Sequence, residues 1–132
     1  MARILLADDD ELVRATVASM LRDLDHEVFE ATNGNEALEV LERVQVDAAV
    51  LDILMPQKEG IETLRDLRKR WPKLPVLMIS GGDRTGWNDA LGMATVLGAN
   101  RTLRKPFTPR QLAEHIAAML AEAASGAARP KE

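Results

Sequence analysis

The sequence lacks cysteine and tyrosine, and its 132 residues include only two phenylalanines and two tryptophans. Without cysteine, the chain can form neither a disulfide framework nor a thiolate metal site. So few aromatic rings argue against a surface that stacks nucleic-acid bases. Basic charge is not in excess either, because 17 basic and 21 acidic residues give a net charge of −4. Duplex binding depends on basic surface, so we expect no direct contact with nucleic acid.

Long apolar runs are also missing. No stretch approaches the roughly 20 apolar residues that a membrane-spanning helix needs, and the first residues, MARILLADDDE, turn acidic too early for a signal peptide. We therefore expect a cytoplasmic protein with no membrane partner. The hydrophobic share of 46% and the charged share of 29% are ordinary for one globular domain of this length.

Short apolar runs alternate with helical patterns along the chain. Strands are predicted at residues 3–7, 27–31, 48–51, 75–80 and 101–104. Helices are predicted after an N-cap at Asp10, around residues 37–41, and at 61–70, 87–97 and 109–123. The first of them would carry Leu12, Val13, Thr16, Val17, Met20, Leu21 and Leu24 on one apolar face. We expect residues 1–123 to form one domain and residues 124–132 to form a disordered tail.

The composition of the strands predicts their order in the sheet. Residues 3–7, 48–51 and 75–80 are continuously apolar, as interior parallel strands are, whereas residues 27–31 and 101–104 are mixed, as edge strands are. The alternation with helices predicts an α/β fold, a doubly wound five-stranded parallel sheet of order 2-1-3-4-5, which is the flavodoxin-like arrangement. Ligands bind such sheets beyond the carboxyl ends of the first and third strands, where the winding reverses.

Three aspartates follow those two strands. Asp8 and Asp9 come directly after the first strand, and Asp52 comes directly after the third. Neighbouring parallel strands end at the same edge of a sheet, so the three carboxylates are predicted to converge and repel one another. A divalent cation relieves that repulsion, and an all-oxygen site with few carboxylates suits Mg²⁺. Asp10 is assigned to the helix cap and not to this site.

The other two strand ends add groups that bind phosphate. Ser80 supplies a hydroxyl at the end of the fourth strand, and Gly81 allows a backbone N–H to approach an anion closely. Lys105, after the fifth strand, supplies a compact cation. A metal site, a hydroxyl, a lysine and a carboxylate together favour phosphoryl transfer onto Asp52. Each feature alone has a plainer explanation as a cap or a turn residue, and the hypothesis depends on their combination.

Four segments, ILLADDDE, AVLDILMPQKEG, PVLMIS and LRKPF, resemble the receiver domain of two-component response regulators. The resemblance covers about residues 2–122. It implies that Asp52 is the phosphoacceptor, that Mg²⁺ is bound by Asp9, Asp52 and the backbone carbonyl of Leu54, and that Asp8 assists through water. Ser80 and Lys105 would contact the phosphoryl group. The resemblance further implies a phosphohistidine donor on a sensor histidine kinase or a phosphotransfer protein.

The chain departs from the family pattern in three places. Lys105 follows Ser80 by 25 residues, more than is usual, and Gly81 replaces the usual alanine. Thr102 stands where the family often has an aromatic switch residue. We therefore expect the lengthened loop GGDRTGWN, with Trp87 as its reporter, to respond to phosphate. The alternatives are that Trp87 only anchors the following helix, and that the signal passes through the fifth strand around Thr102.

Two rival functions share parts of this pattern. A haloacid dehalogenase-like phosphatase would need an acid two residues after Asp52, where Leu54 stands, and a flavodoxin would need a hydroxyl- and glycine-rich loop after the first strand. We favour a stand-alone receiver that catalyses only its own phosphorylation and dephosphorylation and signals through a downstream protein. The basic residues Arg65, Arg68, Lys69, Arg70 and Lys73 are interpreted as a solvated helix face. No function is assigned to His26 or His115.

Overall fold

The computed structural model of the chain describes residues 2–53, 60–80 and 98–125. The elements in chain order are β1 (Arg3–Ala7), α1 (Glu11–Asp23), β2 (Glu27–Ala31), α2 (Gly34–Arg43), β3 (Ala48–Asp52), α3 (Gly60–Arg70), β4 (Val76–Ser80), β5 (Arg101–Arg104) and α5 (Pro109–Ser125). The helix predicted at residues 87–97 lies outside the described residues. No helix in the described part of the chain is long and apolar enough to span a bilayer.

All five strands form one parallel sheet in the order β2-β1-β3-β4-β5, which confirms the predicted topology. The continuously apolar strands are interior and the two mixed strands are the edges, as their compositions predicted. The bounds of β1, β2 and β5 agree with the prediction, and those of β3 and β4 differ from it by one residue. In particular, Asp52 is the last residue of β3 instead of the first residue after it.

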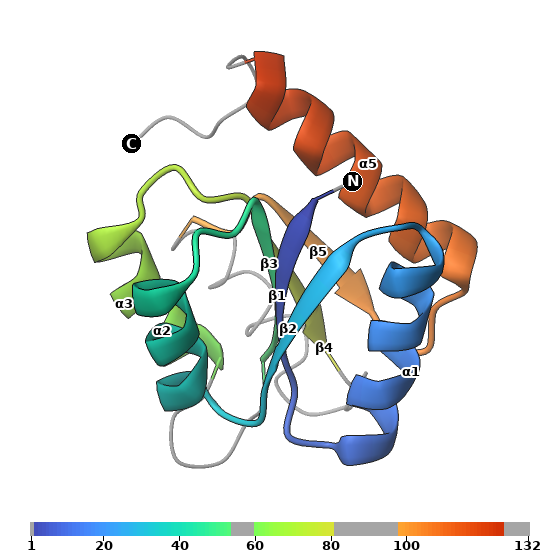
Figure 1. The fold of residues 1–132 in the computed structure, drawn as a ribbon, viewed down its shortest axis with the longest axis horizontal. Coiled ribbons are helices and arrows are strands. Elements are labelled where there is room, and N and C mark those ends of the chain that lie inside the picture. Colours follow the sequence, from blue (N-terminus) through green and yellow to red (C-terminus); the bar gives the residue numbers. More distant parts are fainter. Residues whose placement is uncertain (1, 54–59, 81–97, 126–132) are drawn as a thin grey trace.

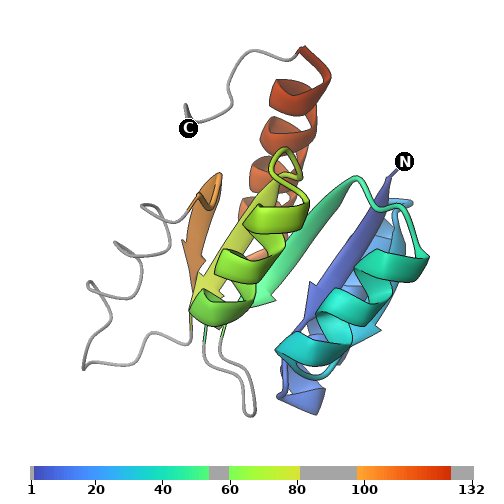
Figure 2. The same ribbon diagram turned by 90° about the vertical axis from the view of Figure 1, so that its left-hand side faces the viewer.

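Each face of the sheet is covered by two of the described helices. Figure 1 shows α1 and α5 on one side of the sheet and α2 and α3 on the other, and Figure 2 looks onto the face of the sheet that α2 and α3 cover. Alternate residues of the interior strands supply both cores. Leu5, Leu51 and Met78 pack with Leu41, Leu64 and Leu67 on the α2–α3 side, and Leu6, Val50 and Ile79 pack with Leu21, Leu112 and Ile116 on the α1–α5 side. The strand ends are therefore held from both faces.

The helices begin at the caps that the local sequence favours. Asp10 accepts a hydrogen bond from the backbone N–H of Val13 at 3.0 Å, which confirms its predicted role as the N-cap of α1. The predicted apolar face of α1 is too wide, because Leu12 is 76% exposed and Leu24 is 40% exposed. The buried stripe of α1 is narrower and consists of Val17, Ala18 and Leu21.

Arg68 ties the end of α3 to the chain that leads into β5. Its guanidinium donates hydrogen bonds to the carbonyls of Gly98 and Trp71, at 2.9 and 3.0 Å, and to Asn100 Oδ1 at 2.8 Å. Gly98 has φ = 111°, a backbone conformation that favours glycine, and a Cβ atom there would displace the Arg68 side chain, whose Nε would lie 2.9 Å away. The expectation of a solvated basic face is wrong for Arg68, because the tertiary structure brings these acceptors to it.

Asn100 is a second part of this connection, since its Oδ1 also accepts a hydrogen bond from the backbone N–H of Val76 at 2.8 Å. We expect Asn100→Leu to lower the free energy of unfolding by about 2 kcal/mol, because both Val76 and Arg68 lose an acceptor. Asn100→Asp keeps the acceptor and serves as the control. Urea unfolding followed by circular dichroism measures both. A leucine variant as stable as wild type would contradict this account of the connection.

Candidate functional site

Three aspartates meet at the carboxyl edge of the sheet. Asp8 follows β1 and is fully buried, Asp52 ends the neighbouring strand β3 and is 5% exposed, and Asp9 is exposed. One side-chain oxygen from each residue lies within 4.8 Å of the other two. The convergence predicted from the strand order is therefore confirmed for these three residues. It follows from the parallel pairing, which sets Ala7 beside Leu51 at the ends of the two strands.

Lys105 reaches this cluster from the end of β5, which lies two strands away from β3 in the sheet. Its Nζ lies 3.1 Å from Asp8 Oδ2 and 3.6 Å from Asp52 Oδ1. The backbone N–H of Lys105 donates to the carbonyl of Ser80 at 2.7 Å, so the pairing of β4 with β5 delivers the lysine to the strand end. Ser80 itself is 4% exposed. The sequence-predicted Asp8, Asp9, Asp52, Ser80 and Lys105 thus all lie at strand ends along this edge.

The donor set of the cluster fits a hard divalent cation. Opposite ligands of Mg²⁺ lie about 4.2 Å apart, so three oxygens within 4.8 Å of one another need only small side-chain adjustments to share one ion. Carboxylate oxygen is the ligand type that Mg²⁺ prefers, and neither nitrogen nor sulfur competes in the described part of the site. Within the described residues, Lys105 offsets part of the negative charge and a divalent cation would offset the rest.

Gly60 fixes the relation between Asp52 and the helix that follows it. The N–H of Gly60 donates to the carbonyl of Ile53 at 2.7 Å. A Cβ atom at position 60 would clash with the Asp52 carbonyl oxygen and lie 2.7 Å from Ile53 Cα. Backbone cannot give way as a flexible side chain can, so only glycine allows α3 to begin this close to the end of β3.

Several residues named from the sequence lie outside the described residues or away from the cluster. Leu54, Gly81 and Trp87, together with the loop GGDRTGWN, lie outside the described part of the chain. Thr102 is half-buried in β5, where its register partner is Met78. Since Met78 belongs to the core on the α2–α3 side, Thr102 faces that side of the sheet. Its position there does not test whether it acts as a switch.

One residue beside the cluster was missed by the sequence reasoning. The guanidinium of Arg14 donates to the backbone carbonyl of Asp8 at 2.9 Å, and its side chain is only 13% exposed. Its position in the first part of α1 could be predicted, but arginine is common on exposed helix faces. Nothing local in the sequence indicates that this one turns back toward the acidic turn.

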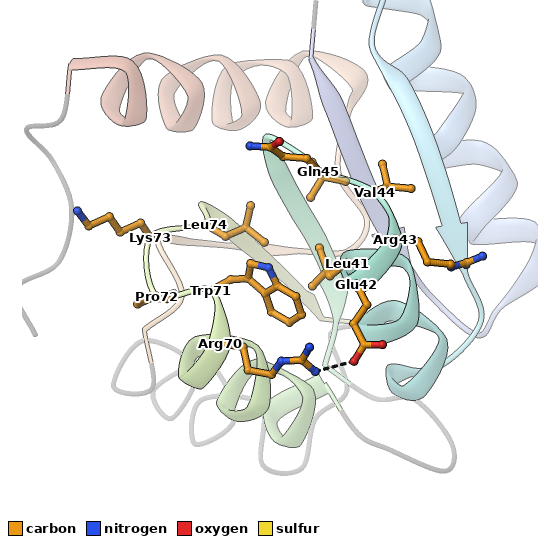
Figure 3. A pocket seen from close by; sticks show the side chains of 11 residues that line it. Leu41, Glu42, Arg43, Val44, Gln45, Arg70, Trp71, Pro72, Lys73 and Leu74 are labelled. Atoms are coloured by element: carbon orange, nitrogen blue, oxygen red, sulfur yellow. Dashed lines mark hydrogen bonds and ion pairs between the residues drawn. The ribbon is translucent and has the colours of Figure 1, made fainter.

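A separate hollow of about 650 Å³ lies at the opposite edge of the sheet, between the ends of α2 and α3 (Figure 3). Arg70 forms an ion pair with Glu42 at 2.7 Å across it, and the Arg70 guanidinium stacks over Trp71, 4.5 Å from the ring centroid. Arg70 is exposed, as the expected solvated basic face requires, and it forms these contacts at the surface. These contacts join two helices, and the chemistry-bearing residues predicted from the sequence lie at the other edge.

The two histidines form part of the scaffold. His26 Nδ1 accepts a hydrogen bond from the backbone N–H of Ala2 at 3.0 Å, and His115 Nδ1 accepts one from Arg101 Nε at 2.9 Å. Partial burial is the main cause that lowers the pKa of each, with the charge of Arg101 adding to the effect at His115. Within the described residues, neither belongs to a group able to hold a metal ion.

Comparisons with known proteins agree on one family. The family model described as the response regulator receiver domain matches residues 4–117. The chain is 33% identical to the alkaline phosphatase synthesis transcriptional regulatory protein PhoP of Bacillus subtilis and 38% identical to the response regulator MprA of Mycobacterium leprae. Each match covers 89% of this chain but only 48% and 50% of those relatives, so the chain spans about half their length.

A solved structure agrees with these sequence matches. The chain resembles the response regulator receiver domain protein (CheY-like) from Methanospirillum hungatei, with a TM-score of 0.88 and 28% identity. That match covers 96% of this chain and 98% of the solved chain.

Asp8 is paired with Lys105 and Asp9 is exposed, so neutralising each of them is expected to change the stability of the metal-free protein in a different direction. We expect Asp9→Asn to raise the free energy of unfolding by about 1 kcal/mol, because it removes repulsion from two nearby carboxylates. We expect Asp8→Asn to lower it by more than that, because it breaks the buried ion pair with Lys105. Urea unfolding in a chelator at neutral pH measures both. Shifts of the same sign in the two variants would contradict the assignment of repulsion and pairing.

Proposed function

The chain belongs to the response regulator receiver domain family, and we propose that Asp52 accepts a phosphoryl group from a phosphohistidine donor in a Mg²⁺-dependent reaction. The observation that carries the proposal is the meeting of Asp8, Asp9 and Asp52 with Lys105 at one edge of the sheet. Membership in the family implies a histidine kinase as the source of the phosphoryl group. A phosphotransfer protein is an alternative donor with the same chemistry.

The proposed step is an in-line displacement at phosphorus. A carboxylate oxygen of Asp52 forms the new P–O bond while the P–N bond to the donor imidazole breaks, and the imidazole nitrogen keeps the electron pair of that bond. The product on this chain is an aspartyl phosphate. Hydrolysis reverses the modification when water attacks phosphorus and Asp52 leaves as a carboxylate. The chain therefore acts on itself, and the family is not one of conventional enzymes.

Each neighbouring group has a proposed part in that step. Asp8, Asp9, Asp52 and the backbone carbonyl of Leu54 would hold Mg²⁺, with Asp8 acting through water. When bound, the cation neutralises charge on the phosphoryl oxygens. Lys105 is close enough to the acids to move from Asp8 or Asp52 to a phosphoryl oxygen, and Ser80 and the N–H of Gly81 would donate hydrogen bonds to the others. These roles follow from the family resemblance and from the positions of the described residues.

We propose that the domain signals through a phosphorylation-dependent contact with another protein. The match to the CheY-like receiver over 96% of this chain supports the receiver part of the proposal. The relatives PhoP and MprA are about twice as long, and PhoP is a transcriptional regulatory protein. The proposal for this chain is limited to protein contacts, because its acidic balance disfavours nucleic acid.

The phosphoacceptor can be tested with a small phosphodonor. We expect acetyl phosphate with Mg²⁺ to add one phosphoryl group to the wild-type chain, and none to Asp52→Asn, as measured by intact-protein mass spectrometry. Asp47→Asn is the matched control, because Asp47 is an acid at the opposite edge of the sheet that accepts a hydrogen bond from the backbone N–H of Arg3. Equal phosphate uptake by wild type and Asp52→Asn would contradict the assignment of Asp52 as the phosphoacceptor.

The proposed switch is the loop GGDRTGWN with Trp87. We expect beryllofluoride with Mg²⁺, a mimic of the phosphoryl group, to change the emission of Trp87 in a Trp71→Phe background. Trp71 is removed because it contacts Arg70 at the other edge of the sheet and would add a constant background. If bound mimic leaves Trp87 emission unchanged while Thr102→Ala alters the response of β5 amides in hydrogen exchange, the signal passes through Thr102 instead.

A further inference from the structure

The backbone of the acidic turn between β1 and α1 is held at several points. The N–H of Asp8 donates to the carbonyl of Ala31 at 3.1 Å, and Asp8 Oδ1 accepts a hydrogen bond from the N–H of Asp10 at 2.9 Å. The carbonyl of Asp8 accepts the hydrogen bond from Arg14 Nη1. This carbonyl belongs to the planar peptide group that links Asp8 to Asp9. Its orientation therefore decides the direction in which the exposed Asp9 side chain leaves the backbone.

Arg14 is itself held in place from β2. Its Nε donates to Glu30 Oε1 at 3.0 Å, while the other oxygen of Glu30 accepts a hydrogen bond from Arg22 Nη2 at 3.1 Å. The Glu30 carboxylate thus bridges two arginines that lie on one side of α1. Arg14 contacts the acidic turn, whereas Arg22 is 52% exposed and donates hydrogen bonds to Glu30 and to the carbonyl of Val28.

We propose that Arg14 is a positioning residue for the metal site. It holds the peptide group between Asp8 and Asp9 so that the Asp9 carboxylate faces Asp8 and Asp52, and Glu30 orients Arg14 for this task. The inference rests on the proposed Mg²⁺-dependent function and concerns a residue that contacts neither the metal nor the phosphoryl group. It assigns to a partly buried arginine a role that its charge alone would not predict.

The charge of Arg14 and its positioning role predict opposite changes in Mg²⁺ affinity when Arg14 is replaced. The guanidinium of Arg14, bonded to the backbone of the acidic turn, repels a divalent cation bound by that turn, so an effect of charge alone would make Mg²⁺ bind more tightly once Arg14 is removed. Loss of positioning would make Mg²⁺ bind more weakly. Lysine at position 14 separates the two effects further. It keeps the charge but has a single ammonium on a flexible stem, which cannot reproduce the two-pronged contact with Asp8 and Glu30.

The test is a calorimetric titration of Mg²⁺ into the whole chain without a phosphodonor. We expect Arg14→Gln and Arg14→Lys each to raise the dissociation constant about tenfold, the size of effect known for residues that orient metal ligands. Arg22→Gln is the matched control, because it removes an arginine from the same carboxylate, and we expect a change of less than about twofold from this exposed pair. Glu30→Ala keeps Arg14 but removes the carboxylate that orients it, so we expect a smaller rise in the dissociation constant for Mg²⁺.

A second readout separates positioning from general support of the fold. With acetyl phosphate, we expect the half-saturating Mg²⁺ concentration of the Arg14 variants to rise, while the rate at saturating Mg²⁺ stays within about threefold of wild type. Unchanged or tighter Mg²⁺ binding by Arg14→Gln overturns the inference, even if the variant melts at a lower temperature. A wild-type chain that binds no Mg²⁺ overturns the proposed function as well, whereas wild-type binding with unaltered variants overturns the role of Arg14 alone.

Discussion

Repulsion among carboxylates at one edge of the sheet is the constraint around which this molecule is arranged. Because β1 and β3 are parallel neighbours, Asp8 and Asp52 are brought together by the same pairing that builds the core. The fold cannot separate them without breaking that pairing. Lys105, delivered by β5, offsets part of the charge, and a divalent cation would offset more. The excess negative charge is thus expected to favour binding of a divalent cation, and the bound cation would in turn allow an anionic phosphoryl group to approach the acids.

The apolar burial of the interior strands compensates for the repulsion among the acids at their ends. The repulsion between two carboxylates about 4 Å apart is about 4 kcal/mol at an effective dielectric constant of about 20. By comparison, each fully buried leucine or isoleucine contributes about 1.5–3 kcal/mol, and Ile4, Leu5 and Leu6 of β1 are all fully buried in the two cores. Burial along a single strand therefore outweighs the repulsion at its end. The anchoring of the interior strands on both faces also leaves the acids little freedom to move apart.

The features that sequence reasoning predicted are those set by local pattern or by strand order. Asp10 caps its helix through residues three positions away, and the meeting of Asp8 with Asp52 requires only the order of two strands. The contacts it missed are those of arginines. Arg14, Arg68 and Arg70 each reach partners on another element, over a long and flexible side chain. Such partners are decided by tertiary packing, so a basic helix face looks alike in sequence whether it is solvated or bonded.

The charged residues at the two edges of the sheet explain why a hollow alone does not identify the functional site. The amino edge has the hollow between α2 and α3, yet its charges already form an ion pair and a stacked contact between Glu42, Arg70 and Trp71. The carboxyl edge gathers three carboxylates and one ammonium in the described part of the chain. Chemistry is expected where like charges are held together at a cost in stability, since nothing in the packing of the core requires them. The repulsion among the acids at the carboxyl edge lowers the stability of the fold, whereas the ion pair and the stacked contact at the amino edge do not. That difference, more than the shape of either surface, favours the carboxyl edge as the site where a phosphoryl group and its metal would bind.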